Sequence, residues 1–131
     1  MYVPAIKYAR PVRLFEIGPY RAILLTDCES EGTIQYAHVL FVHEHGSRMP
    51  CFAVAAEIQT ALSWFADLDV DRSDVDVGSH VLGVFPGDGH INMGNSDAWA
   101  DLDTFLLRAL ELVRQHLAVT EQPRELPLPP A

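Results

Sequence analysis

Residues 33–43 read TIQYAHVLFVH, and this stretch decides the fold class. It is rich in β-branched and aromatic residues, which are favoured in strands. Its apolar residues divide between the two faces of such a strand, with Ile34, Tyr36, Leu40 and Val42 on one face and Ala37, Val39 and Phe41 on the other. Apolar residues on both faces predict a central strand that is covered on both sides.

Shorter strand patterns lie on both sides of this stretch. They cover residues 12–17, 21–26, 49–58, 80–85 and 90–93. Residues 86–89 read Pro-Gly-Asp-Gly, and an Asp-Gly pair tolerates the positive φ angles of a tight hairpin turn. Successive strands joined by short turns predict antiparallel pairing, so we expect an antiparallel sheet of about five to six strands.

Two helices are expected beside this sheet. Apolar residues from Trp99 to Leu117 recur at helical spacing and predict a long C-terminal helix packed on one face of the sheet. A weaker pattern predicts a short mid-chain helix over residues 59–66. The prolines that follow the long C-terminal helix predict a mobile tail over residues 123–131.

The sequence therefore predicts a single α+β domain over residues 1–122.

The composition restricts the partners that the chain is expected to have. It holds 131 residues, 18 of them acidic and 9 basic, with a formal net charge of -9. A field of this sign repels phosphate backbones and anionic lipid head groups, so neither nucleic acid nor a membrane surface is an expected partner. We expect a basic protein as a partner, and a homo-oligomer is a further hypothesis below. The start lacks a secretory pattern, and Cys28 and Cys51 form no CxxC pair, which predicts a cytoplasmic protein with reduced thiols.

A glycine-rich segment, residues 83–97, holds the first candidate site. Asp88, His90 and Asn92 lie beside an expected helix N-terminus, where backbone amides can bind an anion, and His80 is a further candidate ligand-binding residue. His90 could act as a general base. The alternative is a tight hairpin followed by a capped helix, in which the glycines serve geometry alone. No nucleotide-binding motif is present, and we expect no cofactor.

The other histidines give a weaker signal. His43 and His45 form a His-x-His pair, but a metal site needs a third ligand, which His80, His90 or Glu57 could supply only through tertiary contact. We therefore expect a polar hairpin loop and no metal. His38 lies among apolar residues, so we expect a hydrogen-bonded core histidine there.

The second candidate site is an acidic loop. Its alternating aspartates are Asp67, Asp69, Asp71, Asp74 and Asp76. In the register of a calcium-binding EF-hand, Arg72 would replace the glycine at the sharp turn and Gly78 would replace the bidentate glutamate, which argues against calcium. We expect a solvated loop that attracts a basic protein partner.

These features lead to three hypotheses. The first is a non-enzymatic protein-binding or regulatory protein, because charge is concentrated and catalytic motifs are absent. The alternative is a small enzyme or ligand-binding domain with a polar site around Asp88, His90 and Asn92. The third is a homo-oligomer, because a central strand that is apolar on both faces needs a second covering layer, from the short helix or from another subunit.

Overall fold

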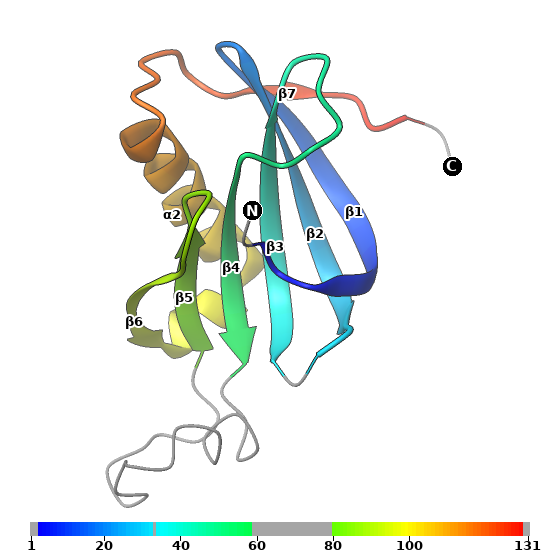
Figure 1. The fold of residues 1–131 in the computed structure, drawn as a ribbon, viewed down its shortest axis with the longest axis vertical. Coiled ribbons are helices and arrows are strands. Elements are labelled where there is room, and N and C mark those ends of the chain that lie inside the picture. Colours follow the sequence, from blue (N-terminus) through cyan, green and yellow to red (C-terminus); the bar gives the residue numbers. More distant parts are fainter. Residues whose placement is uncertain (1–2, 33, 59–79, 130–131) are drawn as a thin grey trace, which may run out of the picture.

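One antiparallel sheet of seven strands dominates the fold (Figure 1). A computed structural model of the chain describes residues 3–32, 34–58 and 80–129. The strands are β1 (Ile6–Ile17), β2 (Tyr20–Ser30), β3 (Gln35–Glu44), β4 (Phe52–Ile58), β5 (His80–Phe85), β6 (Ile91–Ser96) and β7 (Arg124–Leu126). Their order in the sheet is β6-β5-β4-β3-β2-β1-β7, so each of the first six strands lies beside its neighbour in sequence. Short connections explain this order for every pair of successive strands from β1 to β6 except β4 and β5, which residues 59–79 separate.

The predicted architecture was wrong in its strands and helices. The sheet has seven strands instead of five to six, and the described residues contain one α-helix, α2 (Leu102–His116), of 15 residues. The long helix expected from Trp99 is interrupted, because residues 97–100 form a separate 3-10 turn, η2 (Asp97–Ala100). The expected mid-chain helix over residues 59–66 lies outside the described residues.

Two successive caps explain the interruption. The Ser96 hydroxyl accepts a hydrogen bond from the Ala98 amide at 3.1 Å and begins η2. Asp101 then has extended backbone angles, φ -76° and ψ 121°, and its carboxylate accepts hydrogen bonds from the amide and the hydroxyl of Thr104. A side chain that satisfies these amides starts a new helix, so α2 begins at Leu102. Apolar spacing alone does not reveal this break.

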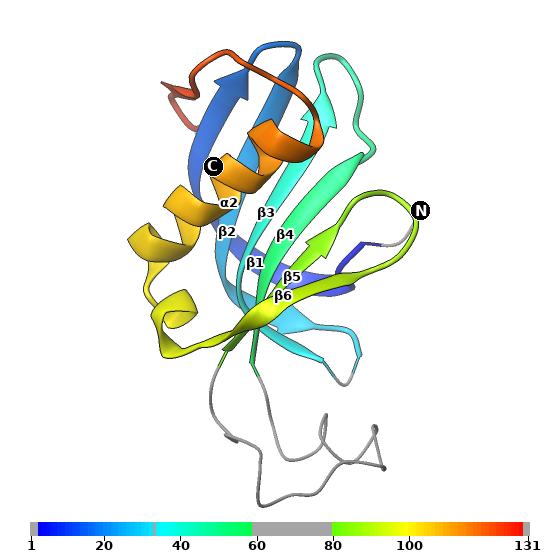
Figure 2. The ribbon, with the colours of Figure 1, turned by 90° about the vertical axis from the view of Figure 1, so that its left-hand side faces the viewer.

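Helix α2 covers one face of the sheet, as Figure 2 shows. Phe105, Ala109, Leu112 and Val113 of α2 are fully or almost fully buried. They belong to the main core, whose buried sheet residues are Phe15, Ile17, Ala22, Leu24, Leu40, Val42, Phe52, Val54, Ala56, Leu82 and Val84. We call the face of the sheet that α2 covers the helix face.

The opposite face of the sheet has a smaller core. Val39, Ala53, Ala55 and Phe85 are buried there, and Ile6 of β1 packs against them. The first residues of β1 cross this face in front of the neighbouring strands (Figures 1 and 2). The prediction that residues 33–43 form a strand buried on both sides is therefore confirmed for β3. Part of the second layer comes from β1 of the same chain, which the sequence did not predict.

A bulge changes the face on which Tyr36 lies. The register of β3 and β4 shifts between the pairs Tyr36–Glu57 and His38–Ala56. A bulge adds one residue on one strand and so reverses the alternation on one side of it. The sequence spacing had predicted that Tyr36 lies on the same face as Leu40. Because of the bulge, Tyr36 packs with the smaller core on the opposite face.

The C-terminal residues return to the sheet. Residues 124–126 form β7, which pairs with β1 from Leu14 to Glu16. Two ion pairs join these strands, Arg13 with Glu125 at 2.7 Å and Arg124 with Glu16 at 2.8 Å. This part of the expected mobile tail is thus an edge strand, and the sheet extends past residue 122. No helix in the described part of the chain is long and apolar enough to cross a membrane.

Candidate functional site

A carboxyl–imidazole pair, in which the carboxyl is buried and the imidazole is partly exposed, lies on the face opposite α2. Glu57 belongs to β4 and His90 directly precedes β6, and His90 Nε2 is 3.0 Å from Glu57 Oε1. Their side chains are only 10% and 30% exposed, respectively. The His90 ring also stacks on Phe85, with 4.8 Å between the ring centroids.

Gly83 of β5 makes room for this pair. A Cβ atom at this position would lie 2.6 Å from His90 Nε2, which is too close for a real side chain, and 3.0 Å from Glu57 Oε1, which is tighter than most real contacts. The pair therefore reaches across β5 because residue 83 has no side chain. A glycine inside a strand often marks such a close approach.

Burial favours the neutral forms of both groups. It raises the pKa of Glu57 from 4.5 to about 7, and it lowers the pKa of His90. Glu57 Oε1 is completely buried and receives no well-aligned hydrogen bond from the described residues, although Nε2 is close to it. The short contact is therefore not a strong ion pair, and the carboxyl keeps its proton until close to neutral pH.

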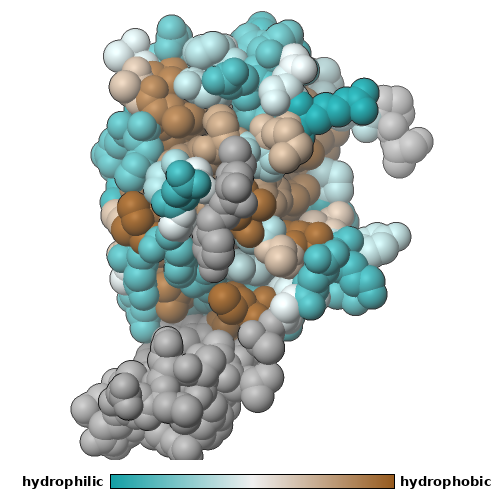
Figure 3. Space-filling model, viewed as in Figure 1, coloured by the Kyte–Doolittle hydropathy of each residue, from teal (hydrophilic) through white to brown (hydrophobic). Residues whose placement is uncertain are grey.

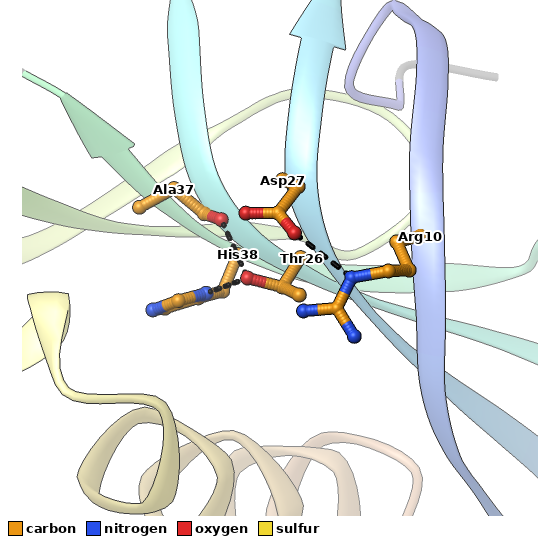
Figure 4. A network of polar contacts seen from close by, with 5 residues as sticks. All are labelled: Arg10, Thr26, Asp27, Ala37 and His38. Atoms are coloured by element: carbon orange, nitrogen blue, oxygen red, sulfur yellow. Dashed lines mark hydrogen bonds and ion pairs between the residues drawn. The ribbon is translucent and has the colours of Figure 1, made fainter.

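A second polar network lies on the helix face (Figure 4). His38 Nε2 is 2.8 Å from the Ala100 carbonyl oxygen, and His38 Nδ1 is 2.9 Å from the Thr26 hydroxyl. A carbonyl only accepts, so Nε2 carries the proton and donates, and Nδ1 accepts from the hydroxyl. His38 is buried, which confirms the predicted core histidine. The network ties the end of η2 to the sheet, a structural role.

His80 does not join His90. Along β5 it alternates with Val81 and shares the helix face with Leu82 and Val84, whereas Gly83 and Phe85 face the other side. Burial lowers the pKa of His80, with a smaller contribution from His38, and its Nδ1 atom is buried without a hydrogen-bond partner in the described residues. The two predicted site histidines therefore lie on opposite faces of the sheet.

The remaining predicted site residues are dispersed. Asp88 is exposed and makes no side-chain hydrogen bond or ion pair with another described residue. Asn92 is exposed, and its Oδ1 accepts a hydrogen bond from the Gly94 amide at 2.7 Å. His43 Nδ1 donates to the Glu44 carbonyl, and His45 is exposed. Among the described residues, no three His, Cys, Asp or Glu side chains gather as metal ligands. The aspartates of residues 67–76 lie outside the described residues.

Sequence reasoning missed the contact between Glu57 and His90. Glu57 was considered only as a third metal ligand beside His43 and His45. One signal was present: a glutamate at the end of the apolar run FAVAAE, together with a glycine inside the apolar strand HVLGVF. Nothing in the sequence indicated that these two strands are neighbours and bring His90 to Glu57.

The two edges of the sheet differ in their protection. The β7 edge is only three residues long, has prolines on both sides and carries two ion pairs. Strand β6 reads INMGNS, without charge or proline, and in the part of the chain that the structure describes no strand pairs with its outer side. Ile91 and Met93 of β6 remain 41% and 39% exposed. Short, charged or proline-containing edges resist additional pairing, so β6 is the more receptive edge.

Comparison of the chain with models of protein families, with curated proteins and with solved structures found no match.

Proposed function

We propose that this protein is a non-enzymatic protein-binding domain that accepts an extended segment of a partner along β6. The outer side of β6 carries this proposal, because no described strand pairs with it and it lacks the ion pairs and prolines found at β7. A segment that adds to a sheet edge gains main-chain hydrogen bonds, while side chains of the edge strand provide specificity. Ile91 and Met93 are the apolar side chains available for this contact.

The partner strand is expected to be short. The pairing of β5 with β6 shifts between the pairs Val81–Asn95 and Gly83–Asn92, and Gly94 has a φ of 108°. Such bulges increase the local twist and interrupt regular pairing. We therefore expect the partner to pair mainly along Ile91–Met93, before the bulge.

The alternative, a small enzyme or ligand-binding domain around Asp88, His90 and Asn92, has less support. A catalytic or binding site needs polar groups that converge on one place. Asp88 is exposed, Asn92 bonds within its own turn, and His90 is directed toward Glu57. None of the contacts given above brings the three side chains together, so this alternative has less support than the edge of β6.

Random peptides displayed on phage and selected on the full chain would test the proposal. Selected peptides would then be measured against the double variant Ile91→Lys/Met93→Lys, which places charges on the edge strand. The matched control is Leu107→Lys, because Leu107 is a 72% exposed apolar residue of α2, away from β6. We expect the double variant to lose binding and the control to retain it. Peptides that bind both variants equally would contradict the proposal.

Self-association is an outcome that the same variants distinguish. If the wild-type chain sediments as a dimer and the double variant as a monomer, the segment that occupies the edge is β6 of a second copy. A partner strand and a second copy use the same backbone groups, so a dimer of this kind would compete with the selected peptides. Amide chemical shifts of residues 91–96 would locate the contact in either case.

A further inference from the structure

Among the described residues, no lysine or arginine is paired with the carboxylates that lie on either side of β6. Asp88 precedes the strand and Asp97 follows it, and both are exposed. Residues 80–107 contain no lysine or arginine. The described residues give neither aspartate an ion-pair partner, and the two histidines of this region are held toward their neutral forms by burial.

The strands toward the other edge of the sheet differ from this region in the pairing of their charges. Carboxylates of β1, β2 and β7 are matched there with basic side chains, and the pairs are Lys7–Glu29, Arg10–Asp27, Arg13–Glu125 and Arg124–Glu16. Charge pairing is therefore not spread evenly over the described surface. Carboxylates without a basic partner among the described residues flank β6, whose outer side no described strand covers.

We propose that the occupant of the β6 edge is an extended segment with an apolar centre and basic residues on both sides of it. This inference rests on the proposed function and names the chemistry of the partner. The centre would contact Ile91 and Met93, while Lys or Arg side chains at its ends would face Asp88 and Asp97. Six residues of strand span about 17 to 20 Å, so the two basic ends should be about six to eight residues apart.

The carboxylates add steering and selectivity to a docking contact made by the backbone. Complementary charge at the rim of an interface raises association rates and rejects partners of the wrong sign. The attraction is screened by salt, because both aspartates are exposed. An acidic extended segment would be repelled at both ends of β6, although it can form the same main-chain hydrogen bonds.

Three synthetic peptides with one alternating Val-Thr centre would test this inference on the full chain. Two arginines, two glutamines or two glutamates would flank the centre on each side. We expect the arginine peptide to bind about tenfold more tightly than the glutamine peptide at low salt, to lose this advantage at high salt, and to shift the amides of β6. The glutamate peptide should bind least.

The double variant Asp88→Asn/Asp97→Asn should remove the preference for arginine and leave the affinity for the glutamine peptide unchanged. Equal binding of the arginine and glutamine peptides, with β6 amides shifted by both, would overturn the charge inference and leave the proposed function standing. Absence of β6 shifts with every peptide would overturn both. An arginine peptide whose shifts map away from β6 would also overturn this inference.

Discussion

Replacement of Glu57 by glutamine should remove a pH dependence from the stability of this protein. Glutamine keeps the size of the side chain but cannot ionise. The pKa of Glu57 is raised from 4.5 to about 7 in the folded chain, so between these values the folded state holds a proton that the unfolded state has released. The stabilisation from this group is complete below pH 4.5 and is lost as the pH rises through about 7.

The magnitude follows from the same shift. Each pKa unit corresponds to about 1.4 kcal/mol, so the wild-type chain should lose about 2 to 3 kcal/mol of unfolding free energy between pH 5 and pH 8 through Glu57. The Glu57→Gln variant should lack this loss, while the other titrating groups affect both proteins alike. His90 does not reverse the sign, because burial lowers its pKa and opposes the charged form that would stabilise a carboxylate.

Urea unfolding of both proteins at pH 5, 6, 7 and 8 would measure the effect. The quantity of interest is the difference between the two free energies of unfolding, plotted against pH. We expect the free energy of unfolding of the variant to increase relative to that of the wild type as the pH rises. A difference that stays constant within about 0.5 kcal/mol from pH 5 to pH 8 would refute the reasoning. It would mean that Glu57 is already ionised in the folded chain at pH 5. Carbon NMR of the Glu57 carboxyl would provide an independent titration.

Two further substitutions test the packing on either side of the sheet. Gly83→Ala should destabilise the chain by about 1 to 3 kcal/mol, because its Cβ would meet His90 and Glu57. Gly32→Ala is the control and should be close to neutral, because its Cβ would lie in open space. Equal urea midpoints for the two variants would show that His90 and Glu57 can move aside. His38→Ala should cost about 2 to 4 kcal/mol, because it leaves the Ala100 carbonyl without its donor, leaves the Thr26 hydroxyl with only the long contact to the Ala37 carbonyl, and opens a cavity. His45→Ala is its exposed control, and similar losses in the two variants, measured by urea unfolding, would contradict the assigned network.

The local features of the fold could be predicted from the sequence. Strand β5 begins and ends at the predicted residues, and the Asp-Gly turn leads into β6. Both results depend on alternation and turn chemistry within a few residues of each other. The buried position of His38 could also be predicted, because its neighbours in the strand are apolar.

Features that depend on distant partners could not be predicted. The bulge near Tyr36 reverses its face, and only the pairing with β4 reveals it. Strand β7 lies in a proline-rich stretch with weak strand propensity, and its pairing with β1, which two ion pairs accompany, joins residues 108 to 112 positions apart. The contact between His90 and Glu57 likewise joins residues that are far apart in the chain.

The contact between Glu57 and His90 and the outer edge of the described sheet are connected through the position of β6. His90 directly precedes this strand, stacks on Phe85 and reaches Glu57 across Gly83, so the start of β6 is held against the sheet. An edge strand that is already fixed loses little conformational entropy when a partner strand is added, which favours binding. The buried position that raises the pKa of Glu57 also brings its carboxyl against His90, and this contact holds the start of the strand that we propose as the docking edge.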